Sequence, residues 1–190
     1  MISPKQYQEL IDREARHWGS VGVAPPYPQL WHDQQLFDMF FGSEYRRLLD
    51  GAARSGGHVL ELGSGEGNLA LDLARRKLQV DGIEISAERV KRARENSRSQ
   101  QLNRRVRFLV KDLNTVTLPK QRYSCVVAHD VLHHVLNLDH LLDEVKKTLK
   151  PGGLFLVMDY SGMGKIRKLF AAALFAILPT YQPYKEKWHL

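Results

Sequence analysis

The sequence predicts an α/β fold with a doubly wound parallel sheet, and two observations carry this prediction. From residue 58 onward, short apolar segments alternate with segments of helical periodicity, which is typical of parallel strands joined by helical crossovers. The apolar segments are also hydrophobic over consecutive residues, as in the run from Leu154 to Met158. Such runs indicate strands that are covered on both faces of the sheet.

An N-terminal helical arm is expected before the sheet. Ser3 and Gln6 have the spacing of a capping box, and apolar residues then recur at helical intervals up to Trp18. Residues 19–28 are rich in glycine and proline and predict a loop. A second helix is expected over residues 33–54, where leucine and phenylalanine recur.

The main domain follows as alternating strands and helices. Strands are predicted over residues 58–62, 79–85, 106–110, 123–129 and 154–159, with helices over 66–76, 86–101 and 138–149. Ser86 and Asp139 are the predicted N-caps of the last two helices. A chain that steps outward over three strands and then crosses back gives the order 3-2-1-4-5. Ligands of such sheets bind at the carboxyl ends of the strands, where the order reverses.

Length and composition indicate one globular unit of 190 residues. We divide it into a helical arm (1–55), a sheet domain (56–160) and a helical tail (161–190). The single cysteine, Cys125, excludes an intramolecular disulfide and a cysteine-rich zinc site. The N-terminus has no secretory signal, and the longest apolar run, 169–178, is far shorter than the about 20 residues of a membrane span. A cytoplasmic protein is therefore expected.

The formal net charge is +7, and much of it lies in residues 88–107. This segment holds eight Lys and Arg residues against two Glu residues. It could be a nucleic-acid face or the solvated face of a helix. No aromatic residue is interleaved with the charges before Phe108, and stacking on nucleic acid needs such residues. We therefore do not expect nucleic acid as a partner.

The first strand ends in a glycine-rich loop with the sequence E-L-G-S-G-E-G over residues 61–67. Glycines at alternate positions allow a sharp turn and a close approach to a ligand, and the helix that follows presents free backbone N–H groups. The second strand ends in Glu84, 21 residues after Gly63. An acid at this place is where a ribose diol is held.

The charges of the loop indicate which nucleoside ligand it binds. A dinucleotide loop has the spacing G-x-G-x-x-G, and here the third glycine comes one residue early. Glu61 and Glu66 would repel a pyrophosphate, but they suit an adenosine ligand that carries an ammonium and a sulfonium group. S-adenosylmethionine is such a ligand.

The sequence resembles the class I S-adenosylmethionine-dependent methyltransferases, close to the group that acts on small molecules. The match runs over residues 59–160 and includes segments 61–67, 111–113, 130–135 and 149–154. The resemblance implies a Rossmann-like fold, with Glu84 on the ribose hydroxyls and Asp112 on the adenine amine. The cofactor residues that it implies are Glu61, Gly63, Ser64, Gly65, Gly67, Glu84, Ile85, Asp112, Leu113 and His129.

Four histidines, His129, His133, His134 and His140, fall within twelve residues. Histidine is a common metal ligand, but packing and capping roles are more frequent, and we predict no metal site. His133 or His134 is the candidate catalytic base, because a group that titrates near neutral pH suits removal of a hydroxyl proton. The alternative is that alignment alone suffices, because the sulfonium is already electrophilic.

The acceptor is predicted by elimination. The sequence after the fourth strand lacks the [DNS]-P-P-[YFW] motif of amino-directed nucleic-acid methyltransferases and the glutamate pair of protein arginine methyltransferases. This leaves a small-molecule acceptor, and oxygen is the expected methylated atom ahead of nitrogen and carbon. The alternatives are a cofactor-binding module without turnover, with an interaction or regulatory role, and a nicotinamide dehydrogenase. Trp31-His32 is the expected lid contact.

The resembled fold ends with two further strands, for which residues 161–190 leave no room. Three explanations stay open: the chain is a fragment, the tail replaces these strands, or a second copy of the chain covers the fifth strand as a homodimer. The segment from Ile166 to Tyr184 combines an apolar helix with basic residues. It could be a substrate lid, a peripheral membrane contact or a packing helix.

Overall fold

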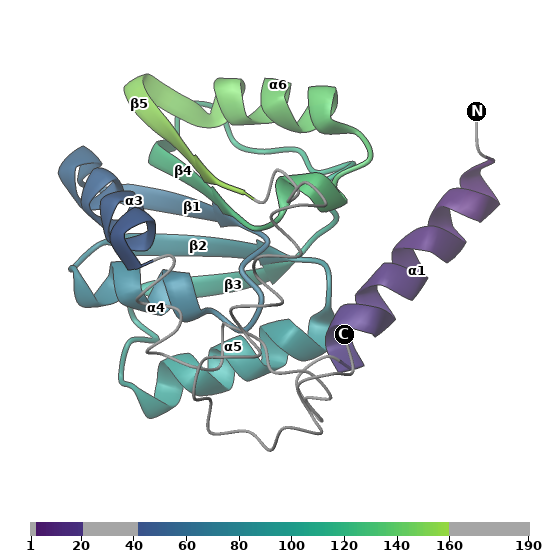
Figure 1. The fold of residues 1–190 in the computed structure, drawn as a ribbon, viewed down its shortest axis with the longest axis horizontal. Coiled ribbons are helices and arrows are strands. Elements are labelled where there is room, and N and C mark those ends of the chain that lie inside the picture. The colour runs from purple at the N-terminus through teal and green to yellow at the C-terminus, as the bar shows by residue number, and fades with distance from the viewer. Residues whose placement is uncertain (1–2, 21–41, 160–190) are drawn as a thin grey trace, which may run out of the picture.

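The computed structural model describes residues 3–20 and 42–159, in which five parallel strands form one sheet with helices around it (Figure 1). The strands are β1 (His58–Leu62), β2 (Gln79–Glu84), β3 (Val106–Val110), β4 (Tyr123–His129) and β5 (Leu149–Met158). The helices are α1 (Pro4–Ser20), α3 (Gly42–Ser55), α4 (Asn68–Arg75), α5 (Ala87–Ser99), the 3-10 turn η2 (Leu132–His134) and α6 (Leu138–Thr148). The order β3-β2-β1-β4-β5 confirms the predicted topology.

Two apolar layers bury the faces of the sheet. On one face, α3, α4 and α5 pack over the strands, with Ala52, Leu73 and Ala93 among their buried residues. On the other face, α6 and the connection over residues 113–118 cover the sheet, and Leu141 is fully buried there. Alternate residues of β1 and β4 face the two layers, so both strands are buried over most of their length. This explains their continuous hydrophobic sequence.

Two details differ from the predicted elements. Helix α6 begins after Asn137, so Asp139 lies in the first turn and is not the cap. A negative charge in that turn is still favourable, because it faces the positive end of the helix dipole. β5 begins at Leu149 instead of Leu154, because Leu149 already pairs with Tyr123 across a register irregularity.

Part of the predicted arm packs directly on the sheet. Helix α3 lies against β4 and β5, and the side chain of Leu156 is 3.0 Å from where a Cβ of Gly51 would be. The remainder of the predicted helix over 33–54, Trp31-His32 and the tail over 161–190 lie outside the described residues. Within the described ranges, no helix has the length and hydropathy to cross a membrane.

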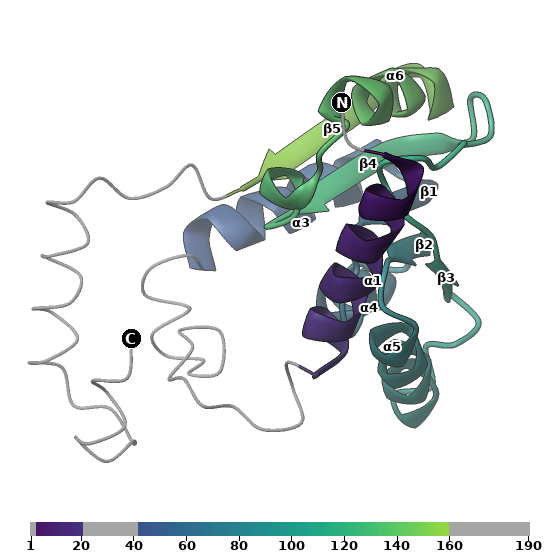
Figure 2. The ribbon, with the colours of Figure 1, turned by 90° about the vertical axis from the view of Figure 1, so that its right-hand side faces the viewer.

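Helix α1 stands beside the carboxyl-terminal edge of the sheet, at the right in Figure 1 and in front in Figure 2. Its predicted capping box is confirmed: Ser3 N donates to Gln6 Oε1 at 2.9 Å, and Gln6 N donates to Ser3 Oγ at 3.2 Å. At its other end, the carbonyl of Gly19 accepts two hydrogen bonds from Arg92 of α5, each 3.2 Å long. These contacts tie α1 to the domain.

Several basic side chains of residues 88–107 form contacts within the fold. Arg92 forms an ion pair with Glu66, with Nε 2.7 Å from Oε1, and Arg94 Nη2 donates to the carbonyl of Phe108 at 2.7 Å. These arginines hold α5 to the glycine loop and to β3. Such internal pairing favours the prediction that nucleic acid is not a partner, which stays a prediction.

A buried carboxylate, Asp81 of β2, connects four strands. The hydroxyl of Tyr123 donates to its Oδ2 at 2.8 Å, and Arg107 donates to both oxygens at 2.9 and 3.0 Å. His58 Nε2 and Arg122 Nη2 lie 3.3 and 3.4 Å from Oδ2. Burial alone would raise the pKa of Asp81, but the hydrogen bonds from Arg107 and Tyr123 outweigh it and lower the pKa. The sequence pattern did not predict this network.

We expect Asp81→Asn to reduce the free energy of unfolding by about 2–4 kcal/mol, because it removes a buried carboxylate that pairs with Arg107 and accepts from the buried hydroxyl of Tyr123. Urea unfolding followed by circular dichroism at pH 7 measures this. Because the folded pKa lies below the unfolded value of about 3.9, the stabilisation by Asp81 is present above that value and is lost as the pH falls toward the folded pKa. The difference between the two proteins should therefore shrink in acid.

Asp50→Asn is the matched control, since Asp50 forms an exposed ion pair with Arg76. No measurable loss of stability is expected for it. Equal effects of the two substitutions would contradict the structural role of Asp81.

Candidate functional site

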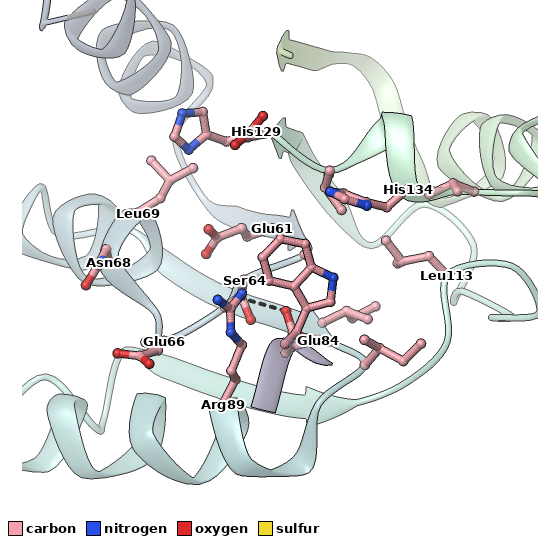
Figure 3. Close-up of a pocket in the computed structure, with 18 of the residues that line it drawn as sticks. Glu61, Ser64, Glu66, Asn68, Leu69, Glu84, Arg89, Leu113, His129 and His134 are labelled. Atoms are coloured by element: carbon pink, nitrogen blue, oxygen red, sulfur yellow. Dashed lines mark hydrogen bonds between the residues drawn. The ribbon is translucent and has the colours of Figure 1, made fainter. Parts of the chain in front are cut away.

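A pocket with a volume of about 1090 Å³ opens at the carboxyl-terminal edge of the sheet. Its walls come from the glycine loop after β1, the end of β2, the loop after β3, the turn after β4 and helix α1 (Figure 3). The strand order reverses between β1 and β4 at this place. The pocket therefore lies where the topology predicts a ligand.

Two glycines allow the loop after β1 to approach its neighbours. Gly63 has a φ of 67°, and a Cβ atom there would be 2.3 Å from Cγ2 of Val131. Gly67 has a φ of 87°, and a Cβ atom there would be 2.6 Å from Cζ of Phe108. A side chain at either position would face both an unfavourable backbone conformation and a clash. The loop is thus packed against β3 and against the turn after β4.

Glu84, the last residue of β2, is held in place by backbone groups. Its Oε2 accepts a hydrogen bond from Gly65 N at 3.0 Å (Figure 3), and its Oε1 accepts one from Ser86 N at 2.9 Å. Each carboxylate oxygen has a second lone pair, so the group can accept two further hydrogen bonds without moving. Ser86 also caps α5 as predicted, since its Oγ accepts from Arg89 N.

Glu61 is buried in β1 below the pocket. Its Oε2 and the Oγ of Ser64 have no hydrogen-bond partner among the described residues. Burial raises the pKa of Glu61 well above its usual range, and the neighbouring carboxylates Glu84 and Asp72 add to this, while the backbone N–H of Ala70 opposes it. A buried carboxyl oxygen without a hydrogen-bond partner is costly unless a ligand pairs with it. The unpartnered oxygens of Glu61 and Ser64 therefore fit a cationic group of a ligand.

Asp112 lies in the loop after β3 and meets helix α1. The hydroxyl of Tyr7 donates to its Oδ2 at 2.5 Å. Its Oδ1 accepts from both Asn114 N and Asn114 Nδ2, at 2.9 and 2.8 Å. Burial and the hydrogen bond to Asp112 raise the pKa of Tyr7, so that its hydroxyl remains a donor. The residue predicted to bind adenine thus also holds α1.

Several residues of the pocket lining were not predicted as part of the site, Trp18 and Arg89 among them. Tyr7, which contacts Asp112 beside the pocket, was not predicted either. The guanidinium of Arg89 lies 4.7 Å from the ring centre of Trp18, and burial lowers the pKa of Arg89. Trp18 was interpreted as a core residue of the arm, and Arg89 as part of the basic helix face. Arg89 is in the first turn of α5, and helical side chains point toward the N-terminus, here toward the glycine loop.

The turn after β4 brings two histidines into different surroundings. His134 lines the pocket, with its Nδ1 3.3 Å from Oε1 of Glu14 and its ring edge-to-face with Trp18. His133 is not part of the pocket lining, and its Nδ1 lies 2.6 Å from Oδ1 of Asp159. The two rings are 4.0 Å apart between centroids.

The pocket collects nearly all residues that the sequence implied for the cofactor. Every one lines it except Gly67, which packs beneath the loop: Glu61, Gly63, Ser64, Gly65, Glu84, Ile85, Asp112, Leu113 and His129. His129 ends β4, and burial lowers its pKa. The individual roles of these residues stay predictions, because geometry alone does not identify what they bind.

Comparison with known proteins identifies the family. A methyltransferase domain family matches residues 53–187, which is more than half of the chain. The chain belongs to this methyltransferase family. The membership confirms the predicted class, S-adenosylmethionine-dependent methyltransferase, and the cofactor that goes with it. The buried acids and the glycine loop described above fit that cofactor.

Similar proteins include several methyltransferases. An uncharacterized methyltransferase of Mycobacterium tuberculosis is 32% identical over 61% of this chain and 57% of the relative. A ubiquinone biosynthesis O-methyltransferase of Coxiella burnetii is 28% identical over 65% of this chain and 49% of the relative. This chain therefore spans about half the length of these curated relatives.

Two solved structures resemble the fold. The PH0226 protein of Pyrococcus horikoshii has a TM-score of 0.64 and 25% identity, with 80% of this chain and 66% of that chain covered. The cyclase SpnF has a TM-score of 0.55 and 31% identity, with 60% of this chain and 44% of that chain covered. The fold is thus also that of a protein named as a cyclase.

We expect cofactor binding to release a proton from Glu61. The raised pKa keeps this carboxyl group protonated over a wider pH range in the free protein, whereas pairing with an ammonium group favours the ionised form. Affinity for S-adenosylhomocysteine should therefore rise with pH below the raised pKa. Calorimetry at pH 6 in two buffers of different ionisation enthalpy measures the released proton.

Glu61→Gln should abolish this proton release and flatten the pH dependence. Glu95→Gln, an exposed acid on α5, is the matched control and should behave like the unmodified protein. Buffer-independent enthalpies for the unmodified protein would contradict the protonated state of Glu61.

Proposed function

We propose that the protein transfers a methyl group from S-adenosylmethionine to a hydroxyl group of a small molecule. The observation that carries this proposal is the pair of buried carboxylates, Glu61 and Glu84, on either side of a glycine loop in a chain of the methyltransferase family. Opposite them, the turn after β4 presents histidines that could accept a proton. The pocket thus combines a cradle for the cofactor with a group suited to acid–base chemistry.

The cofactor cradle divides between three strand ends. Glu61 and the loop would hold the methionine ammonium group, and Glu84 would hold the ribose hydroxyls with the lone pairs that its backbone bonds leave open. Asp112 would accept from the adenine amine beside Leu113, which is largely buried. When bound, S-adenosylmethionine supplies a sulfonium-activated methyl group.

The remaining task of the protein is to orient the acceptor and to remove its proton. A positioned nucleophile gains rate because its approach is no longer random. A neutral imidazole can take a hydroxyl proton at physiological pH, and both His133 and His134 lie on the turn beside the pocket. The O-methyltransferase among the relatives supports oxygen as the acceptor atom.

Other partners stay predictions. Contact of the tail with a membrane surface rests on residues outside the described ranges. A homodimer through β5 is supported by its position at the edge of the sheet and by Leu154 and Val157, which are 40% and 47% exposed.

The decisive experiment is calorimetric titration with S-adenosylhomocysteine. We expect binding that weakens about tenfold or more in Glu84→Gln, which loses one acceptor at the end of β2. Gly65→Arg should abolish binding, because Gly65 has a φ of 51° and faces the pocket. Glu95→Gln should bind as the unmodified protein does.

Turnover is then measured as S-adenosylhomocysteine release with a panel of catechols, hydroxyquinols and sugars. Methylation of a hydroxyl group in this panel supports the proposal. Tight binding with no turnover of any acceptor class would favour the alternative of a cofactor-binding module. Folded protein that binds NAD but not S-adenosylhomocysteine would overturn the proposal.

A further inference from the structure

We propose that Asp159 positions His133 as the base that accepts the hydroxyl proton, while His134 serves the contact with helix α1. This inference rests on the proposed function, since it names the group that takes the proton released by O-methylation. Asp159 was not among the residues that the sequence motifs singled out. It is the first residue after β5, at the same sheet edge as the pocket.

Asp159 is anchored to the turn after β4 by its side chain. Its Oδ2 accepts hydrogen bonds from the backbone N–H groups of Val131 and Leu132, at 3.2 and 2.6 Å. Its Oδ1 lies 2.6 Å from Nδ1 of His133. The carboxylate therefore fixes the position of the turn and the orientation of the His133 ring in one arrangement.

The contact determines which nitrogen of His133 carries the proton. An ionised carboxylate only accepts hydrogen bonds, so Nδ1 of the neutral ring must be the donor. The lone pair is then on Nε2, which is the arrangement of a general base held by a carboxylate, as in Ser-His-Asp triads. The His133 side chain is 36% exposed, and it belongs to the turn whose neighbouring residues Val131 and His134 line the pocket.

His134 has a different set of contacts. Its Nδ1 faces Glu14, and its ring packs against Trp18, both from α1. Its orientation therefore depends on the position of α1, whereas that of His133 depends on the end of β5. A base must be held within about 0.5 Å of its productive position by its supporting contacts. Asp159 supplies such a contact from the end of a strand of the sheet.

Among residues 3–20 and 42–159, the charged groups around His133 come from three places. Asp159 follows β5, Asp130 follows β4 with its Oδ1 3.9 Å from Nδ1, and His134 is on the same turn. Asp130 has a φ of 52°, and its N–H donates to the carbonyl of Met158 at 2.8 Å. Both carboxylates stabilise the positive charge that the ring acquires with the proton.

The proposed step transfers a methyl group to the acceptor and a proton to His133. The acceptor oxygen gives an electron pair to the methyl carbon as its O–H proton moves to Nε2 of His133. The electron pair of the broken carbon–sulfur bond remains on sulfur, which becomes a neutral thioether. The imidazolium then returns its proton to solvent, so the free base is regenerated.

The same three residues could also bind a divalent cation, since ligand atoms of Asp130, His133 and Asp159 lie within 4.8 Å of one another. To bind a metal here, His133 would have to use the lone pair of Nδ1 or rotate its ring so that Nε2 faces the metal. Both oxygens of Asp159 already accept hydrogen bonds and would have to give these up or share them. The contacts therefore favour proton transfer, and metal binding is a contrary outcome of the test.

The test compares Asp159→Asn and His133→Gln, with Asp143→Asn on the exposed face of α6 as the matched control. Nitrogen-15 NMR of histidine-labelled protein, without any substrate, reports the tautomer of each neutral ring. We expect Nδ1–H for His133 in the unmodified protein and in Asp143→Asn. In Asp159→Asn, the amide can donate to Nδ1, and the Nε2–H form should increase.

Activity and binding provide the second readout. With the acceptor that turns over fastest in the panel, both variants should lose about 10²-fold in kcat with little change in KM. Their affinity for S-adenosylhomocysteine should match that of the control. An Asp159→Asn, His133→Gln double variant should be no slower than either single variant.

Three results would overturn the inference. One is an Nε2–H tautomer of His133 in the unmodified protein, or a tautomer that Asp159→Asn does not change. Another is full kcat in both variants while the unmodified protein binds the cofactor and methylates the acceptor, which would leave the proposed function intact. The third is Mn²⁺ binding, seen by electron paramagnetic resonance, that activates turnover and is lost in Asp130→Asn.

Discussion

The close approach of the glycine loop to its neighbours is the constraint on which the pocket depends. A Cβ atom at residue 63 or 67 would lie 2.3 or 2.6 Å from Val131 or Phe108. Only with glycine at both positions can the loop pack between β3 and the turn after β4. In that position, the N–H of Gly65 reaches Glu84, and the loop leaves the buried carboxyl group of Glu61 facing the pocket. The need for glycine at residues 63 and 67 thus determines how Glu61 and Glu84 lie relative to the loop.

The sequence predicted the sheet, its strand order and the strand-end acids, because these depend on local periodicity and on motifs within one connection. It did not predict Tyr7, Arg89, Asp81 or Asp159 in their roles. Tyr7 and Asp112 are 105 residues apart, and Asp159 contacts a turn 27 residues earlier. Such pairings follow from how elements meet in space, and no local pattern encodes them. The prediction of Asp139 as the N-cap of α6 was wrong, because several polar residues lie near the start of this helix and the sequence does not determine which of them is the cap.

Helix α1 touches both ends of the pocket, through Tyr7 on Asp112 and through Glu14 on His134. The hydrogen bond of Tyr7 contributes about 1 kcal/mol, and the part-exposed contact of Glu14 contributes about 1 kcal/mol or less. Micromolar binding of a ligand corresponds to about 8 kcal/mol. The contacts of α1 are therefore much weaker than the binding of a micromolar ligand, so a cofactor could displace them. They are still strong enough to favour one position of the helix. Because Asp112 would be shared between Tyr7 and the adenine, occupation of the pocket and the position of α1 should be linked.

The carboxyl edge of the sheet has two halves with different chemistry. The ends of β1, β2 and β3 carry the acids that suit the cofactor, and the ends of β4 and β5 carry the histidines and Asp159. Methyl transfer needs these halves in a fixed relation, since the acceptor oxygen must lie in line with the bond that breaks. Direct pairing of β1 with β4 fixes the position of one half relative to the other. The close approach of Gly63 to Val131 fixes the loops that follow these two strands in the same way. A side chain at residue 63 would thus displace the turn that carries His133 as well as the loop after β1, so the geometry of the two halves depends on the same glycine.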